Sequence, residues 1–278
     1  MGMLVNGRQC DTVSLLDRGL QYGDGLFETI AVIGHEMPLW QRHYTRLSKG
    51  CEKLALEVPQ EQQIKDEIEQ EIHHHGEQSG RCVVKLIVTR GTAGKGYCPA
   101  EGGEQRIVIL RQQAGFSRHD RETGIDIHLC ETRLASGSPL AGIKHLNRLE
   151  QVLTARETEA NNCREAVVCD SEGFVVEGVM SNLFWVIGGE LHTPLLDRSG
   201  VAGVMREEVM AQAAVLGISC REVRVIPDEL SGAEAIFLTN AVNGIVPVRR
   251  LAGRECSLDA ISHDLLDTIN RKLMKHEA

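Results

Sequence analysis

The order of hydrophobic and polar residues predicts strands and helices along the first part of the chain. The stretch "MLVNG" ends in an Asn-Gly turn, and "LFETIAVIGHEMPLW" indicates a hairpin about Gly34. A helix is expected next, with one side formed by Leu39, His43, Arg46, Leu47, Gly50, Cys51 and Leu54. A polar helix from about residue 59 to 75 and the strands "RCVVKLIVTR" and "QRIVIL" complete this part.

The apolar periodicity lapses between residues 111 and 124, where the density of charged residues rises. This composition is typical of an exposed connection between two hydrophobic cores. We therefore expect a small N-terminal α/β domain over residues 1–112, a connection over 113–122, and a larger C-terminal α/β domain over 123–278.

The second part of the chain is expected to begin with the strand "IDIHL" and a helix that opens at Lys144. Helical spacing predicts that this helix faces the core with Ile143, Leu146, Leu149, Val152 and Leu153. Further strands are expected at "EAVVCD", "FVVEG", "NLFWVI", "ELHT" and "AIFLTNAV", with helices at "GVMREEVMAQAAVLG" and at the C-terminus. The mixed content indicates the α+β or α/β fold class.

Composition and charge argue against several functional classes of protein. The chain has 278 residues, of which 42% are hydrophobic and 25% charged, as in ordinary globular proteins. A formal charge of −9 with scattered Lys and Arg argues against nucleic-acid and membrane-surface binding, and no stretch approaches the roughly 20 apolar residues of a membrane span. Nine cysteines without a C-x-x-C pair fit reduced thiols, so we expect a cytoplasmic protein.

Two conspicuous motifs predict no metal or nucleotide site. His73, His74 and His75 are consecutive, so on a helix they point about 100° apart and cannot converge on one ion. The stretch "GTAGKGY" is not a P-loop, because Lys95 is followed by Gly96 rather than Ser or Thr. A flexible loop is the plain interpretation, although Lys95 and Tyr97 could form an anion-binding lip.

Two other stretches have the chemistry of binding sites. In "SGVAGVMREEV", small residues precede a helix whose first N–H groups could hold a phosphate, although ordinary helix starts look the same. In "VVEGVMSNLFW", Glu177 ends an apolar strand and needs a cationic partner. A protonated pyridine nitrogen and an Arg side chain fit this carboxylate equally well.

Together, several segments resemble the fold-type IV family of pyridoxal-phosphate enzymes. They are "DRGLQYGDGLFET", "HYTRL", "TRGTAGKGY", "AGIKHLNRLEQ", "EGVMSNLF", "GVMR" and "FLTNAV", and they span about residues 4 to 248 in the family's order. The resemblance implies a two-domain aminotransferase class IV architecture with pyridoxal 5'-phosphate at the domain interface. It also implies a homodimer in which a loop of one subunit closes its neighbour's site.

The same resemblance implies roles for particular residues. Lys144 would bind the cofactor covalently, and Glu177 would keep its pyridine nitrogen protonated so that the ring can accept electrons. The cofactor phosphate would be held by Arg46, Val204, Met205, Thr239 and Asn240.

The segment "AGIKHLNRLEQVL" is similar to the lyase branch of this family. Thr29 stands where transaminases commonly have Gly or Val, and its hydroxyl could relay a proton, although a β-branched strand residue is the plain alternative. Arg148 stands where branched-chain transaminases have Tyr, and could touch the cofactor's phenolic oxygen or a substrate carboxylate. Lys95 and Tyr97 fall where D-amino-acid transaminases hold the substrate carboxylate, and Arg90 is a further candidate for this role.

The expected substrate is a small molecule. The lyase branch implies conversion of 4-amino-4-deoxychorismate to 4-aminobenzoate and pyruvate, with Lys144 and Thr29 moving protons. Two alternatives remain open: a class IV transaminase acting on D-alanine or branched-chain amino acids, and a ligand-binding homologue that has lost catalysis.

Overall fold

The computed structural model describes residues 2–75, 81–100, 105–111 and 115–273. Their contacts divide the chain into two compact units, each described below by itself. The first unit contains the described residues up to 111 together with Ile143–Asn147, and the second contains 115–142 and 148–273. The expected domain limits stay a prediction, and residues 113 and 114 of the connection lie outside the described part. Lys144 belongs to the first unit, whereas the sequence pattern assigned it to the C-terminal domain.

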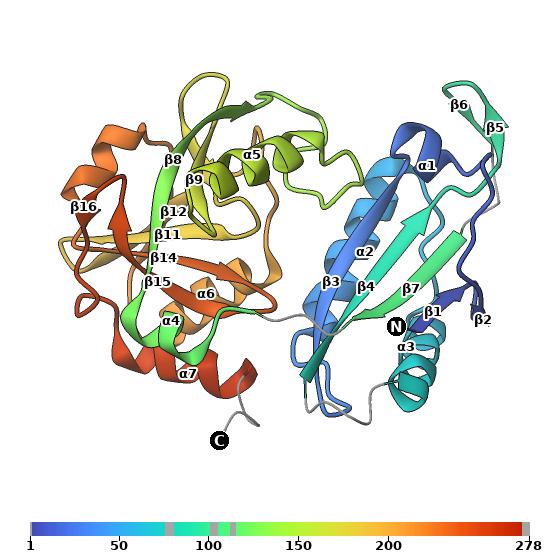
Figure 1. Cartoon of the computed structure of the whole chain (residues 1–278), viewed down its shortest axis with the longest axis horizontal. Helices are drawn as coiled ribbons and strands as arrows, with labels where there is room; N and C mark the ends of the chain where they lie inside the picture. The colour runs from blue at the N-terminus through green and yellow to red at the C-terminus, as the bar shows by residue number, and fades with distance from the viewer. Residues whose placement is uncertain (1, 76–80, 101–104, 112–114, 274–278) are drawn as a thin grey trace. The chain divides into compact units, whose positions relative to one another are not determined.

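The first unit is built on an antiparallel sheet with the strand order β2-β1-β7-β4-β3 (Figure 1). The strands are β1 (Gly2–Val5), β2 (Arg8–Gln9), β3 (Gly25–Ile33), β4 (Arg81–Thr89) and β7 (Gln105–Arg111). A separate small hairpin pairs β5 (Gly94–Lys95) with β6 (Cys98–Pro99). The helices are α1 (Arg18–Tyr22), α2 (Trp40–Leu54) and α3 (Glu61–His75).

Strand register places α2 and α3 on the same face of this sheet. Leu26, Val88 and Arg106 are aligned across β3, β4 and β7 and therefore share a face. A Cβ on Gly50 of α2 would meet Leu26, and Arg106 donates to Glu67 of α3. The opposite face carries half-buried side chains in two rows, Val5-Ile107-Ile87-Phe27 and Met3-Ile109-Lys85-Thr29.

The second unit contains a larger sheet with the order β10-β9-β8-β15-β14-β11-β12-β13, to which β16 is added beside β15. The strands are β8 (Ile125–Leu134), β9 (Ala166–Asp170), β10 (Val175–Glu177), β11 (Asn182–Ile187), β12 (Glu190–Pro194), β13 (Cys220–Val223), β14 (Ala235–Asn240), β15 (Gly244–Leu251) and β16 (Arg254–Glu255). Strand β8 is parallel to β9 and β15, and β12 is parallel to β13. The other described pairs of neighbouring strands in this sheet are antiparallel.

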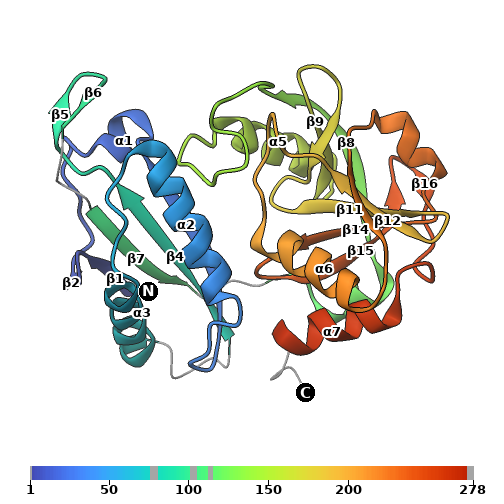
Figure 2. The same cartoon turned by 180° about the vertical axis from the view of Figure 1, so that it is seen from behind.

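Helices cover the second sheet, which explains the apolar character of its inner strands. The helices are α4 (Arg118–Thr123), α5 (Leu149–Ala160), α6 (Val204–Val215), η1 (Pro227–Gly232) and α7 (His263–Leu273), seen from behind in Figure 2. Every residue of β9 is buried, as expected for a strand covered on both faces. Phe184 and Phe237 stack with ring centroids 5.1 Å apart, and Trp185 belongs to the main cluster of the core.

Most elements predicted from hydrophobic periodicity are present, and the mixed α/β fold class is confirmed. Asn6 and Gly7 both have positive φ, 50° and 73°, which the tight turn between β1 and β2 requires. Gly34 has φ 60°, and Ile33 and Glu36 exchange two backbone hydrogen bonds around it.

The predicted start of the helix at Lys144 was wrong. Helix α5 begins at Leu149, with Arg148 as its N-cap, and Leu149 is 72% exposed. Lys144 lies in an extended segment instead, because its carbonyl accepts a hydrogen bond from the Phe27 amide. The buried face of α5 carries Thr154 and Thr158, not the apolar stripe, since spacing alone cannot tell which side of a helix meets the core.

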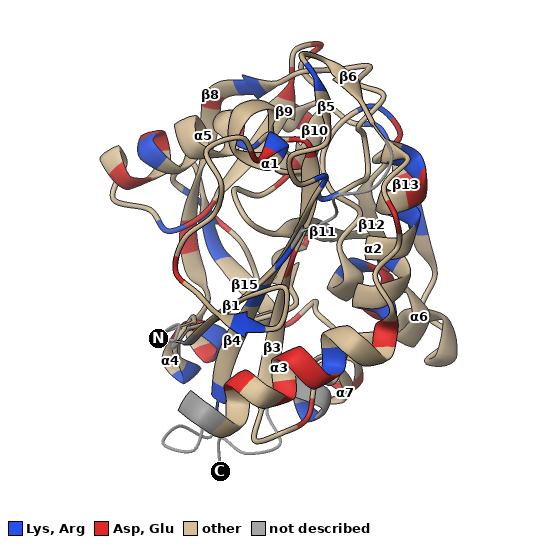
Figure 3. Ribbon diagram, turned by 90° about the vertical axis from the view of Figure 1, so that its right-hand side faces the viewer, with Lys and Arg blue, Asp and Glu red and all other residues tan. Residues whose placement is uncertain are grey.

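The distribution of charged residues and the hydropathy of the helices can be compared with the expectations from composition. In the view of Figure 3, Lys and Arg are interspersed with Asp and Glu over the described ribbon rather than gathered in a stripe. Among the described helices, none has both the length and the hydropathy that crossing a bilayer demands.

The close approach of β3 and β4 at Gly25 gives a test of this packing. A Cβ at Gly25 would lie 2.4 Å from the Val88 carbonyl oxygen, which belongs to the backbone and cannot move aside. We expect Gly25→Ala to lower the free energy of unfolding by about 2 kcal/mol or more. Gly232→Ala is the control, because a Cβ there meets nothing within 4 Å. Equal urea midpoints for the two variants would contradict this packing.

Candidate active site

Lys144 is presented on the first unit by a short strand-like segment. The Phe27 amide donates to the Lys144 carbonyl at 3.0 Å, and the Leu146 amide donates to the Gly25 carbonyl at 3.0 Å. These bonds pair the segment with β3, the edge strand of the sheet. The half-buried Lys144 places its Nζ 4.3 Å from the centroid of the Phe27 ring. A cation over an aromatic face is favourable, so the amine has a defined position.

Thr29 shares the sheet face of Phe27, because the two residues are two positions apart on β3. Thr29 is half-buried and pairs in register with Lys85, whose Nζ lies 5.2 Å from the same Phe27 ring. The structure therefore presents a lysine amine and a threonine hydroxyl on one face of the first sheet. The sequence analysis did not identify Lys85 as a residue of this face. The signal was a lysine between apolar residues in the strand that became β4.

Arg46 has a partner that the sequence analysis did not foresee. Its Nε and Nη2 donate to the two carboxylate oxygens of Glu28, which also accepts from His43 Nδ1 at 2.6 Å. Burial alone would raise the pKa of Glu28, but Arg46 and His43 outweigh it and lower the pKa to about 2. Burial lowers the pKa of His43, so its ring is neutral and donates to the carboxylate. The predicted role of Arg46 in phosphate binding stays a prediction.

The second unit presents a helix N-terminus suited to an anion. Helix α6 begins at Val204 and Met205, and its N-cap, Gly203, makes no side-chain cap hydrogen bond. The first N–H groups of a helix have no partner within it and lie at the positive end of its dipole. A Cβ on Gly203 would lie 1.9 Å from Asn182 Oδ1, so only glycine fits in this cradle. These features fit a phosphate group.

Thr239 and Asn240 lie where β14 ends. The Thr239 hydroxyl donates to the Gly244 carbonyl at 2.9 Å. Asn240 accepts from the amides of Val242 and Asn243 and donates to Ser181 Oγ at 3.1 Å. Both predicted phosphate residues thus also hold the turn between β14 and β15.

Glu177 is buried at the end of β10 and is tied to the loop before α6. Its Oε2 accepts a hydrogen bond of 2.8 Å from the Val201 amide. Asn182 Nδ2 donates to the carbonyl of the same Val201 at 2.8 Å. The backbone of one residue, Val201, therefore links the Glu177 carboxylate to Asn182, whose side chain lies beside Gly203.

Glu165 is a buried carboxyl group that the sequence analysis missed. It accepts from the Val179 amide at 2.7 Å, the Met180 amide at 3.3 Å and Ser181 Oγ at 2.7 Å. It therefore supports the loop that carries Ser181, the partner of Asn240. Burial raises its pKa to about 7 against these hydrogen bonds. The signal in the sequence was a charged residue directly before the fully buried strand β9.

The candidates for substrate carboxylate binding differ in their surroundings. Arg90 donates to both carboxylate oxygens of Asp24 and to the carbonyls of Leu54 and Ala55, which makes it a framework residue. Lys95 and Tyr97 are exposed on the β5–β6 hairpin. Arg148 is half-buried at the start of α5. The roles of Lys95, Tyr97 and Arg148 in carboxylate binding stay predictions.

The raised pKa of Glu165 predicts a pH dependence of stability. Between its ordinary 4.5 and about 7, the folded protein retains a proton that the unfolded chain has released. The free energy of unfolding contributed by this group therefore falls as pH rises through that window and is constant above it.

The substitution Glu165→Gln should remove this dependence. Relative to wild type, the variant should gain stability between about pH 5 and about pH 8 in urea unfolding. Glu172→Gln, at an exposed carboxylate paired with Arg198, is the control and should follow wild type. Parallel profiles for wild type and Glu165→Gln would rule out a titrating Glu165.

Comparison with known proteins places the chain in one family. The amino-transferase class IV model matches residues 25–251. An aminodeoxychorismate lyase of Vibrio harveyi is 33% identical over 92% of this chain and 93% of that protein. A putative branched-chain-amino-acid aminotransferase of Methanocaldococcus jannaschii is 28% identical over 98% and 94%.

A solved structure agrees over the whole length. The crystal structure of 4-amino-4-deoxychorismate lyase from Pseudomonas aeruginosa superposes with a TM-score of 0.88 at 38% identity, covering 99% of this chain and 98% of the other. The architecture expected from the resemblance is thereby confirmed. The chain belongs to the amino-transferase class IV family.

Proposed function

We propose that the chain is a pyridoxal-phosphate-dependent lyase that converts 4-amino-4-deoxychorismate into 4-aminobenzoate and pyruvate. The observation that carries the proposal is Lys144, whose amine lies over Phe27 on the sheet face that also carries Thr29. Similarity to lyases of Vibrio harveyi and Pseudomonas aeruginosa over nearly the whole chain supports the choice of reaction.

The residues of the second unit suit the two ends of the cofactor. The amides at the start of α6, with Thr239 and Asn240, would hold its phosphate. Glu177, buried and hydrogen-bonded to the Val201 amide, would accept a hydrogen bond from the protonated ring nitrogen. When bound, pyridoxal phosphate supplies an electron-accepting ring that stabilises negative charge on the substrate carbon attached to nitrogen.

Lys144 and Thr29 supply proton transfer. Lys144 Nζ would hold the cofactor, and the same amine would take the proton from the substrate ring carbon that bears nitrogen. The ether bond to the enolpyruvyl group then breaks, and that fragment gains a proton to become pyruvate. The Thr29 hydroxyl, which shares the sheet face of Phe27, would pass this proton. The two products contain all the atoms of the substrate, so no water is consumed.

The rival function is transamination on the same fold, to which the likeness to a putative branched-chain aminotransferase lends weight. Thr29 distinguishes the two, because a hydroxyl at this position suits a lyase better than the Gly or Val of transaminases. Conversion of the cofactor to its amino form by D-alanine or leucine would favour the transaminase. A purified protein that stays colourless with added pyridoxal phosphate would favour a non-catalytic homologue.

We propose a homodimer, supported by apolar surface on the first unit. The face of the sheet opposite α2 and α3 carries half-buried Met3, Val5, Ile87, Ile107 and Ile109. Leu15 and Leu16 nearby in sequence are 80% and 66% exposed. Contiguous apolar surface of this kind marks association sites.

A cytoplasmic location is likewise proposed. All nine cysteines are free thiols, as expected in a reducing compartment.

The first test is Lys144→Ala. We expect loss of the yellow, covalently bound cofactor and a fall in 4-aminobenzoate release of about a thousandfold or more, because an attachment point and a proton carrier are both lost. Release is followed by product fluorescence. Lys85→Ala is the matched control for colour, since Lys85 also lies over Phe27. Unchanged turnover in Lys144→Ala would overturn the assignment.

The second test is Glu177→Gln. The amide oxygen can still accept from Val201, so the cofactor should remain bound. Without the negative charge, turnover should fall by about a hundredfold. Glu172→Gln, at an exposed ion pair of the same unit, is the control. Kinetics equal to those of wild type would show that Glu177 has only a structural role.

A further inference from the structure

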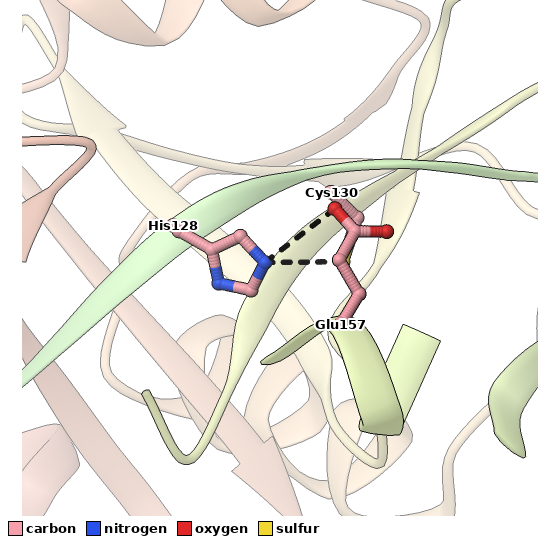
Figure 4. Close-up of side chains that lie close together, drawn as sticks. All are labelled: His128, Cys130 and Glu157. Carbon is pink, nitrogen blue, oxygen red and sulfur yellow. Dashed lines mark hydrogen bonds and ion pairs between the residues drawn. The ribbon is translucent and has the colours of Figure 1, made fainter. Parts of the chain in front are cut away.

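A cluster of three metal-ligating side chains lies in the second unit, and the proposed reaction uses none of the three. His128 and Cys130 are two positions apart on β8 and therefore share a face of the strand. Helix α5 packs on β8 and contributes Glu157. Figure 4 shows the His128 ring and the Glu157 carboxylate pointing toward one another beside Cys130.

The distances suit a tetrahedral ion. His128 Nε2 lies 3.6 Å from Cys130 Sγ and 3.7 Å from Glu157 Oε1, and the three ligand atoms all lie within 4.8 Å of one another. Zinc bonds of about 2.3 Å to sulfur and about 2.0 to 2.1 Å to nitrogen and oxygen imply a sulfur–nitrogen separation near 3.5 Å and a nitrogen–oxygen separation near 3.4 Å. Small side-chain rotations would therefore complete the coordination.

The Glu157 carboxylate is already oriented by the backbone of β8. Its two oxygens accept from the amides of Glu131 at 2.6 Å and Thr132 at 3.0 Å, where the pairing of β8 with β9 shifts register. Each carboxylate oxygen has two lone pairs, so each keeps one for an ion. Burial opposes ionisation, but these hydrogen bonds outweigh it and lower the pKa of Glu157.

The three side chains of the cluster differ in exposure. Cys130 is 1% exposed, whereas the side chains of His128 and Glu157 are 14% and 20% exposed. An ion can therefore enter past His128 and Glu157, and a water molecule can occupy the fourth position. His128 Nδ1 is buried without a hydrogen-bond partner among the described residues, so the polar contacts of this ring face the cluster.

We propose that His128, Cys130 and Glu157 bind one divalent cation of the zinc class. Burial raises the pKa of the Cys130 thiol to about 11, so the thiol is protonated without metal and binding releases one proton to solvent. A thiolate, a carboxylate and a neutral imidazole around a doubly charged ion give a site of zero net charge, which lowers the cost of burial. The ion would tie α5 to β8. This inference does not depend on the proposed lyase reaction.

The test is cobalt binding to chelator-treated, dialysed holoenzyme. One equivalent of Co²⁺ should produce the visible bands of a tetrahedral thiolate site, at longer wavelength than the pyridoxal absorption. Cys130→Ser and His128→Gln should lose these bands. They should also weaken Zn²⁺ binding, measured by chelator competition, by more than about tenfold, since even changes outside the ligand set reach that scale.

Cys98→Ser is the matched control, because Cys98 is an exposed thiol outside the cluster, and it should bind like wild type. If Cys130→Ser does not fold, Glu157→Gln replaces it, since its amide oxygen can keep one backbone hydrogen bond. Absent bands in wild type, or bands that persist at full strength in the cluster variants, would overturn the proposal and leave only adventitious binding elsewhere.

Discussion

The candidate active site depends on the backbone pairing between β3 and the segment Ile143–Asn147. Two hydrogen bonds, from Phe27 to Lys144 and from Leu146 to Gly25, fix a lysine that would otherwise be a flexible surface side chain. The same strand carries Thr29 on one face and Glu28 on the other. Because side chains alternate along a strand, one element serves the candidate chemistry on one side and the buried ion pair under α2 on the other.

In the second unit, single residues hold two side chains of the candidate site at once through hydrogen bonds. Val201 joins Glu177 to Asn182 through its backbone N–H and C=O groups, and Asn182 fills the space beside Gly203. Ser181 joins Glu165 to Asn240 through its hydroxyl group. The two candidate ends of a cofactor site thus rest on neighbouring residues, 181 and 182, at the start of β11. A change at either position would disturb more than one contact.

Sequence reasoning predicted much of the architecture, because the buried strands and helix α2 have clear periodicity. It failed to predict which side of a helix is buried and which polar residues are buried, because periodicity does not show what an element packs against. The apolar residues after Lys144 have helical spacing, yet Leu149 is exposed and Thr154 is buried. The burial of Glu165 and of the Glu28–Arg46 pair was not predicted for the same reason, because a polar residue becomes buried only when distant parts of the chain meet. The likeness of whole segments to a family singled out Lys144 and Glu177 as candidates, which composition alone could not do.

The route of the chain has a consequence for how the first unit can exist. Its residues up to 111 do not contain the strand-like segment that pairs with β3; that segment comes from between two parts of the second unit. A fragment ending near residue 111 would leave the Phe27 amide and the Gly25 carbonyl without these partners at an open sheet edge. The first unit is therefore complete only within the longer chain, and the pairing of β3 with this segment must wait until residue 147 has been synthesised.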